Sequence, residues 1–182
     1  KANNFDRSAA VTVTYREADQ LKGSGWSCRQ LMNTRKSAST AASALPQPPC
    51  IAVDVALAAD KAEVDRHGVD GGVMFMTSVL ALVQGNFDDE FNSVIEFNLS
   101  AIFVATSDQD DPWKGITNID DHLEQHRLWG EGGGYNAPYA VATAWTGKTY
   151  GVYGLAYLGG ACTPERYCVC SDIGGSVGFL RT

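Results

Sequence analysis

The sequence predicts an α/β protein with a mixed, mostly parallel twisted sheet, an antiparallel edge strand and two long helices. Two observations carry this prediction. Segments with an apolar residue at every second position alternate with segments whose apolar residues recur at about every third or fourth position, and these are the periods of strands and helices. Two further extended segments follow the second helix, and this order of elements builds a sheet with helices packed on it.

The elements follow in order along the chain. Strands are predicted at residues 9–15, 51–57 and 95–103, and amphipathic helices at residues 73–91 and 119–129. The strand at residues 51–57 (IAVDVAL) alternates as if one of its faces were buried. Residues 139–145 and 150–158 are extended segments on either side of a Thr-Gly-Lys turn, which predicts a hairpin.

Composition and charge exclude several classes of protein. The 182 residues are 45% hydrophobic and 19% charged, which is enough for about one domain with a core. A formal net charge of −7 argues against a nucleic-acid or anionic-membrane surface. No apolar run reaches the roughly 18 residues of a membrane span. Five cysteines are unusual in a reducing compartment, so we expect a secreted, extracellular protein. The sequence does not predict its oligomeric state.

A boundary is expected just before Cys50. The preceding run SASTAASALPQPP (residues 37–49) is uncharged and rich in Ser, Ala and Pro, which is typical of a linker. The formal charge also changes there, from +4 over residues 1–50 to −11 over residues 51–182. We therefore divide the chain into a segment of residues 1–49 and a domain of residues 50–182.

The string HLEQH places His122 and His126 four residues apart in the second predicted helix, a spacing that can chelate zinc. In the protease motif H-E-x-x-H the Glu directly follows the first His, whereas Glu124 stands one position later and points away from the pair. A solvated helix face is the favoured interpretation. Metal storage by the two histidines is a minor alternative.

Three further motifs are not assigned a catalytic role. Residues 146–149 (TGKT) predict a turn, because Ala142 stands where a phosphate loop needs its first Gly. Residues 108–111 carry three aspartates that do not match an EF-hand and predict a solvated acidic turn, with a calcium site of another type left open. Asn98 begins a glycosylation sequon, which can be used only if its side of the strand faces solvent.

Three segments together resemble the reprolysin or adamalysin group of metzincins, which are secreted zinc metalloendopeptidases. They are residues 51–68 (IAVDVALAADKAEVDRHG), 87–113 (FDDEFNSVIEFNLSAIFVATSDQDDPW) and 153–162 (YGLAYLGGAC). The last segment is the most specific, because residues 143–162 keep the family's spacing of Thr, Gly, G-L-A-Y and Cys. The resemblance implies that residues 50–182 are the N-terminal part of a metzincin-like catalytic domain, its upper subdomain. Residues 1–49 loosely resemble a pro-region tail or a linker.

In this family peptide bonds are hydrolysed by a zinc-activated water. The zinc helix H-E-x-x-H follows the segment matched here by residues 177–182, so the zinc ligands are expected beyond Thr182. No catalytic or metal-ligating residue is therefore assigned within the chain, and we expect the chain alone to be inactive. The resemblance also allows a calcium site, without assigning its residues.

The resemblance assigns substrate binding to Tyr153, Gly154, Leu155 and Ala156, the edge strand on which an extended peptide or protein substrate pairs. Gly154 is expected to keep that edge open to an approaching backbone. The family cysteine matched by Cys162 commonly pairs with one beyond the zinc helix. Pairing among Cys28, Cys50, Cys162, Cys168 and Cys170 stays open. The alternative function is a non-catalytic secreted binding module with the same α/β fold.

Overall fold

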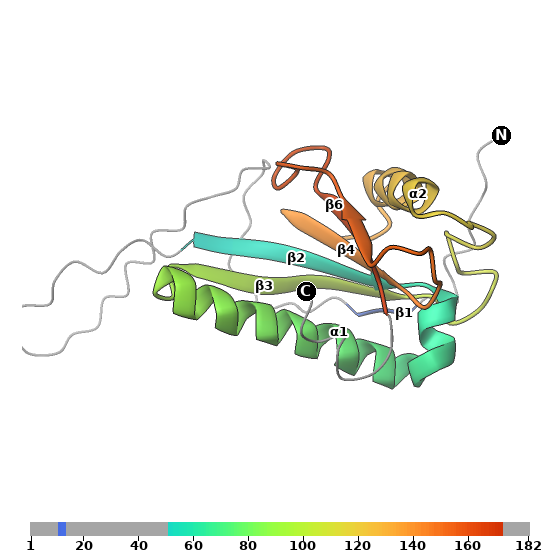
Figure 1. Ribbon diagram of the computed structural model, residues 1–182, viewed down its shortest axis with the longest axis horizontal. Helices are drawn as coiled ribbons and strands as arrows, with labels where there is room; N and C mark the ends of the chain where they lie inside the picture. Colours follow the sequence, from blue (N-terminus) through green and yellow to red (C-terminus); the bar gives the residue numbers. More distant parts are fainter. Residues whose placement is uncertain (1–10, 14–50, 173–182) are drawn as a thin grey trace, which may run out of the picture.

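The computed structural model describes residues 11–13 and 51–172 (Figure 1). These residues form β1 (Val11–Val13), β2 (Ile51–Ala59), α1 (Lys61–Phe91), β3 (Ile95–Val104), α2 (Ile119–Glu131), β4 (Val141–Thr146), β5 (Gly154–Ala156) and β6 (Tyr167–Ser171). The strands make one sheet in the order β1-β3-β2-β4-β6-β5. Pairing is parallel in the centre, while β1 and β5 are antiparallel edge strands. The predicted fold class is confirmed. The expected segment of residues 1–49 lies outside the described residues except for β1.

Helices cover both faces of the sheet, so the domain has three layers (Figure 1). On one face Val55 and Leu57 of β2 pack in a cluster with α1. On the other face Ala56 and Ala58 pack in a cluster with α2 and with the fully buried Trp113. The expectation that β2 buries only one face is therefore wrong for its second half, because helices lie on both sides of it.

An extra residue in β3 changes which side chains face each helix. Val55 pairs with Leu99 but Ala56 pairs with Ala101, so Ser100 forms a bulge, and its hydroxyl donates to the Val55 carbonyl at 3.1 Å. Leu99 packs on the α1 side, whereas Ala101 packs on the α2 side. The predicted strand is confirmed, but its simple alternation breaks at the bulge because one inserted residue reverses the faces.

The first helix begins at Lys61 rather than at residue 73. Its N-cap is Asp60, whose carboxylate accepts a hydrogen bond from the Glu63 backbone N–H at 2.8 Å. Gly68 interrupts the helix with a φ of 72°, and the first turns are too polar to show an apolar period. By length and composition α1 is also long and apolar enough to cross a membrane, and only 17% of its most apolar window is buried, although the helix contacts β2, β3 and β4.

The predicted hairpin between residues 139–145 and 150–158 is wrong. Strand β4 does not pair with β5, because β6 lies between them, parallel to β4 and antiparallel to β5. The TGKT turn instead anchors the start of α1. The Gly147 backbone N–H donates to the Asp60 carboxylate at 3.2 Å, and the Lys148 ammonium donates to the Trp113 carbonyl at 2.6 Å.

Replacing Gly147 by Ala is expected to lower the free energy of unfolding by about 2–4 kcal/mol. A Cβ at this position would lie 2.3 Å from the Ala62 carbonyl oxygen, so the turn and the helix start would have to separate. Urea unfolding followed by circular dichroism measures the change. The control is Gly85→Ala, at an exposed helical position with no atom within 4 Å, which should stabilise by about 0.5–1 kcal/mol. Equal stability of Gly147→Ala and the wild type would contradict this contact.

Candidate functional site

The edge strand β5 contains three of the four residues assigned to substrate binding, and Tyr153 directly precedes it. The Ser171 N–H donates to the Tyr153 carbonyl at 2.8 Å, and the Tyr157 N–H to the Tyr167 carbonyl at 3.5 Å. Hydrogen-bonded pairs alternate along an antiparallel ladder, so the backbone groups of Gly154 and Ala156 point away from β6.

Within the described residues no strand pairs with the outer side of β5. The side chain of Tyr153 is 60% exposed, and Gly154 and Ala156 are also exposed. An exposed edge with unpaired N–H and C=O groups can accept another extended chain. The expected site is therefore accessible, and its two outward-facing residues are Gly154 and Ala156.

Packing inside the sheet and its loop explains why glycine stands at positions 154 and 160. A Cβ on Gly154 would lie 2.9 Å from the Val169 carbonyl oxygen of β6. At Gly160 it would lie 2.0 Å from the Glu165 carbonyl oxygen, in the loop between β5 and β6. Both positions exclude a side chain because of contacts inside the sheet and its loop, so neither glycine is evidence of a bound peptide.

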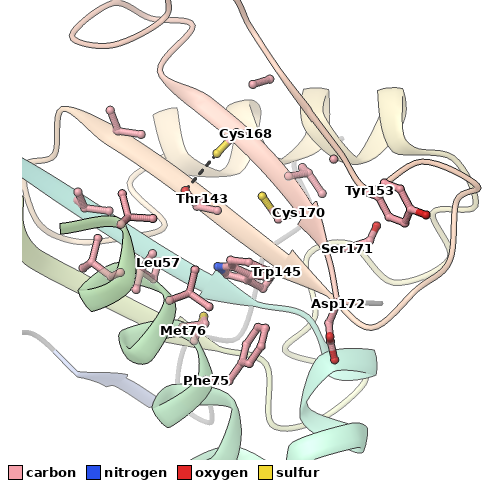
Figure 2. Close-up of a pocket in the computed structure, with 18 of the residues that line it drawn as sticks. Leu57, Phe75, Met76, Thr143, Trp145, Tyr153, Cys168, Cys170, Ser171 and Asp172 are labelled. Carbon is pink, nitrogen blue, oxygen red and sulfur yellow. Dashed lines mark hydrogen bonds between the residues drawn. The ribbon is translucent and has the colours of Figure 1, made fainter. Parts of the chain in front are cut away.

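A cavity of about 520 Å³ lies beside β5, between the sheet and α1 (Figure 2). Apolar side chains of α1 and the central strands form one wall, among them Phe75, Met76 and Trp145. The residues assigned to substrate binding and the start of the segment after β6 complete the lining. An apolar hollow continuous with a free strand edge can receive the side chains of a peptide paired on that edge.

Two thiols enter this cavity from β6. Cys168 and Cys170 lie on the same side of the strand, and both are free (Figure 2). The Cys170 thiol donates to the Cys168 sulfur, which raises the pKa of Cys170 and lowers that of Cys168. The Thr143 hydroxyl lies 3.1 Å from the Cys168 sulfur. Among the described residues, Cys168 contacts a histidine through its carbonyl and not through its thiol, so these residues do not form a Cys-His nucleophile.

The interpretation of HLEQH as a solvated face is wrong, because His122 and His126 are both fully buried under the sheet. The His126 ring contacts the Cys168 carbonyl at 3.1 Å and the Tyr135 hydroxyl at 2.6 Å, one from each nitrogen. Burial lowers the pKa of both histidines to about 3, so the rings are neutral. With both nitrogens of His126 engaged, the pair is not arranged to share a zinc ion.

The acidic turn is also less solvated than predicted. Asp110 and Asp111 are buried, and their carboxylates accept hydrogen bonds from Ser107 and from the Trp113 N–H respectively. These hydrogen bonds hold the turn in place. Asn98 of the sequon is exposed on β3, so its side of the strand meets the condition set for glycosylation.

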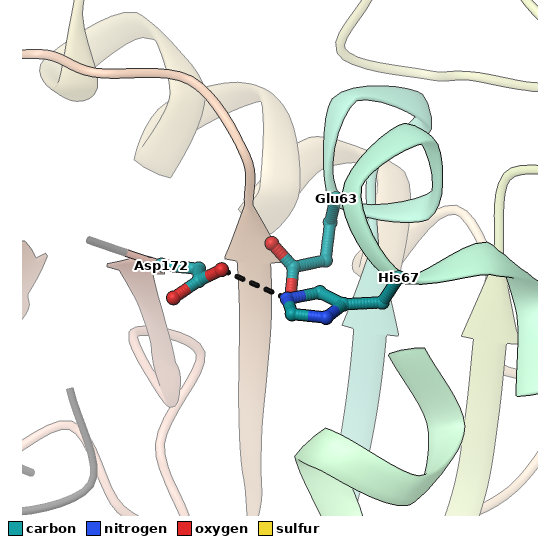
Figure 3. Close-up of side chains that lie close together, drawn as sticks. All are labelled: Glu63, His67 and Asp172. Atoms are coloured by element: carbon teal, nitrogen blue, oxygen red, sulfur yellow. Dashed lines mark hydrogen bonds and ion pairs between the residues drawn. The ribbon is translucent and has the colours of Figure 1, made fainter. Parts of the chain in front are cut away.

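A cluster that sequence analysis missed lies at the start of α1. Glu63 and His67 are one helical turn apart, and Asp172 directly follows β6 (Figure 3). His67 Nε2 lies 2.9 Å from Asp172 Oδ2 and 3.5 Å from Glu63 Oε1. Burial, aided by the Asp172 charge, raises the pKa of Glu63 to about 7. The E-x-x-x-H spacing could have indicated that Glu63 and His67 lie side by side, but no local sequence pattern indicated that Asp172 joins them.

No family model matches the sequence, and no curated protein matches it. Among solved structures, the chain is similar to one described as "Structure of a chaperone-substrate complex", with a TM-score of 0.52 and 13% sequence identity. The match covers 71% of this chain and 24% of that one, so the chain spans about a quarter of that structure's length. At this identity the likeness concerns the fold alone.

Proposed function

We propose that this chain is the substrate-edge portion of a secreted, metzincin-like zinc metalloendopeptidase. In this proposal β5 pairs with an extended peptide or protein substrate. The catalytic zinc ion, its ligands and the general base belong to a segment following Thr182 in a longer protein. The observation that carries the proposal is the free edge at Gly154 and Ala156, which borders an apolar cavity.

The order of elements supports the proposal. A strand, a long helix ending in E-F-N, a second strand, an acidic turn, a second helix and the G-L-A-Y segment follow one another as the family resemblance implies. The G-L-A-Y segment supplies an edge strand, which is the role that the resemblance gives it.

The uncovered apolar surface beside α1 also supports it. Met74 and Leu82 of α1 are 66% and 49% exposed, and the cavity next to β5 is lined mostly by apolar side chains. Neither side chain lines the cavity, so the exposed side of α1 and the cavity are two separate apolar surfaces, and each favours a further packing element. A zinc helix following β6 would meet that requirement.

The alternative is a secreted binding module that never had a zinc helix. The free edge and the cavity serve such a module equally well. The two functions differ in hydrolysis by the longer protein, whereas peptide binding through β5 is common to both.

The experiment that tests the proposal is peptide binding by the 182-residue chain. An array of overlapping casein peptides provides extended probes, and the best binder is made again as two analogues, one with N-methyl groups on its odd-numbered backbone amides and one on its even-numbered amides. Pairing on β5 predicts that one of the two analogues binds at least tenfold more weakly than the other, because only one set of alternate amides faces the strand. Equal binding of the two analogues would refute backbone pairing.

The chain alone is expected to hydrolyse no peptide. The sequence contains no H-E-x-x-H, so it offers no such ligand set to hold zinc and activate water. Incubation of the pure chain with casein and zinc, followed by mass spectrometry, should show intact casein. Cleavage that requires zinc and stops with a chelator would contradict the proposal that the catalytic groups lie elsewhere.

A further inference from the structure

Glu63 is a buried carboxylate without the hydrogen bonds that such a group normally has. Its side chain is fully buried, and neither of its oxygens accepts a hydrogen bond from a described residue. A buried carboxylate left this way is costly, and proteins relieve the cost with a proton, a paired cation or a metal ion. The His67 Nε2 atom lies 3.5 Å from Glu63 Oε1 and is also within reach of Asp172.

The three side chains converge as ligands would (Figure 3). One ligand atom each from Glu63, His67 and Asp172 lies within 4.8 Å of the other two. Ligands at about 2.0–2.2 Å from a tetrahedral ion are roughly 3.3–3.6 Å apart, so small rotations of the side chains suffice to close the site. The Arg66 guanidinium donates to the Asp172 carbonyl at 2.7 Å and fixes that residue's backbone beside the helix.

We infer that Glu63, His67 and Asp172 bind a divalent transition-metal ion that ties the start of α1 to the end of β6. This inference does not depend on the proposed function. One imidazole with two carboxylates suits zinc, manganese or cobalt, whereas calcium and magnesium prefer oxygen ligands alone.

The surroundings give an ion access and leave a coordination position open. The side chain of His67 is 33% exposed, and Asp172 also lines a cavity of about 230 Å³. With three protein ligands, a water completes a four-coordinate ion. Such an ion would join two segments that are 105 residues apart in the sequence.

Zinc alone is the probe. The chelator-treated chain is titrated with zinc by isothermal calorimetry, and one equivalent is expected to bind with a micromolar or lower Kd. The variants Glu63→Gln and His67→Gln should each weaken binding at least tenfold. Because His67 is partly exposed, its variant keeps the fold and decides the test if Glu63→Gln does not fold.

Two controls separate this site from others. Asp65→Asn removes a carboxylate that is 64% exposed on the same helix, and it should change the Kd less than twofold. Replacing Cys168 and Cys170 together by Ser should also leave binding intact, and the cobalt-loaded chain should show no thiolate charge-transfer band. Absence of zinc binding, binding that survives His67→Gln, or binding lost with the two thiols would overturn the inference.

Discussion

The Ala156→Pro variant is expected to bind the extended casein peptide at least tenfold more weakly than the wild type. Ala156 is exposed, and its N–H points away from β6 toward the free side of the edge. Proline removes this donor and places a ring where the peptide backbone would lie. Losing one backbone hydrogen bond and the close approach of the peptide backbone to β5 weakens the binding free energy by about 1.4 kcal/mol or more, which is a tenfold change in Kd. Fluorescence anisotropy with a labelled peptide measures it.

The matched control is Ala156→Ser, which adds one oxygen atom but keeps the backbone N–H. Its Kd should stay within about twofold of the wild-type value. Proline is tolerated where a strand's N–H faces outward on an edge, so Ala156→Pro should keep the fold, as thermal unfolding can verify. Tight binding by Ala156→Pro, or an equal loss in Ala156→Ser, would show that the peptide does not pair through this residue.

Acidification from pH 7 to pH 4 is expected to lower the free energy of unfolding by about 3–4 kcal/mol, because the two buried histidines lose about 6 kcal/mol while Glu63, whose pKa is raised to about 7, regains about 3 kcal/mol. His122 and His126 are buried and neutral, with a pKa near 3 in the folded chain against about 6.5 when unfolded. A lowered folded-state pKa means that the unfolded chain binds protons first, so stability is present above pH 6.5 and is lost as the pH falls toward 3. At His126, protonation would also remove the acceptor that the Tyr135 hydroxyl uses.

Urea unfolding at a series of pH values measures how steeply the free energy of unfolding changes with pH. Two histidines that take up protons on unfolding contribute about 2.7 kcal/mol per pH unit between pH 6 and pH 4, and Glu63, which binds its proton first in the folded chain, offsets about 1 kcal/mol per unit. His126→Gln cannot ionise, so its slope should be smaller than the wild-type slope by about 1.4 kcal/mol per pH unit, whatever its stability at pH 7. A wild-type stability that is flat over this range, or a slope that His126→Gln leaves unchanged, would contradict buried neutral histidines.

The type of most elements was predictable because the hydrophobic periods are local signals, but β6 (Tyr167–Ser171) was not among the predicted strands. The strand at β2, the helix at α2 and the parallel centre of the sheet follow from alternating and helical patterns. What the pattern could not predict are effects of tertiary pairing. The bulge at Ser100 reverses the faces of β3, and the insertion of β6 between β4 and β5 replaces the expected hairpin.

The residues of the candidate site were likewise predictable only in part. Residues 153–156 could be placed on an edge strand from the family resemblance, and β5 is such a strand. The burial of His122 and His126 could not be foreseen, because the polar residues around them indicated a solvated helix. The cluster of Glu63, His67 and Asp172 was missed because its third member comes from the far end of the domain.

The most direct test of the proposed function is the coding sequence that follows the codon for Thr182 in the parent transcript. A metzincin-like protease predicts an in-frame H-E-x-x-H within roughly twenty residues, placed to supply the zinc ligands and the general base. A stop codon there, or an open frame without this motif, would contradict the protease and leave the secreted binding module as the function of the β5 edge.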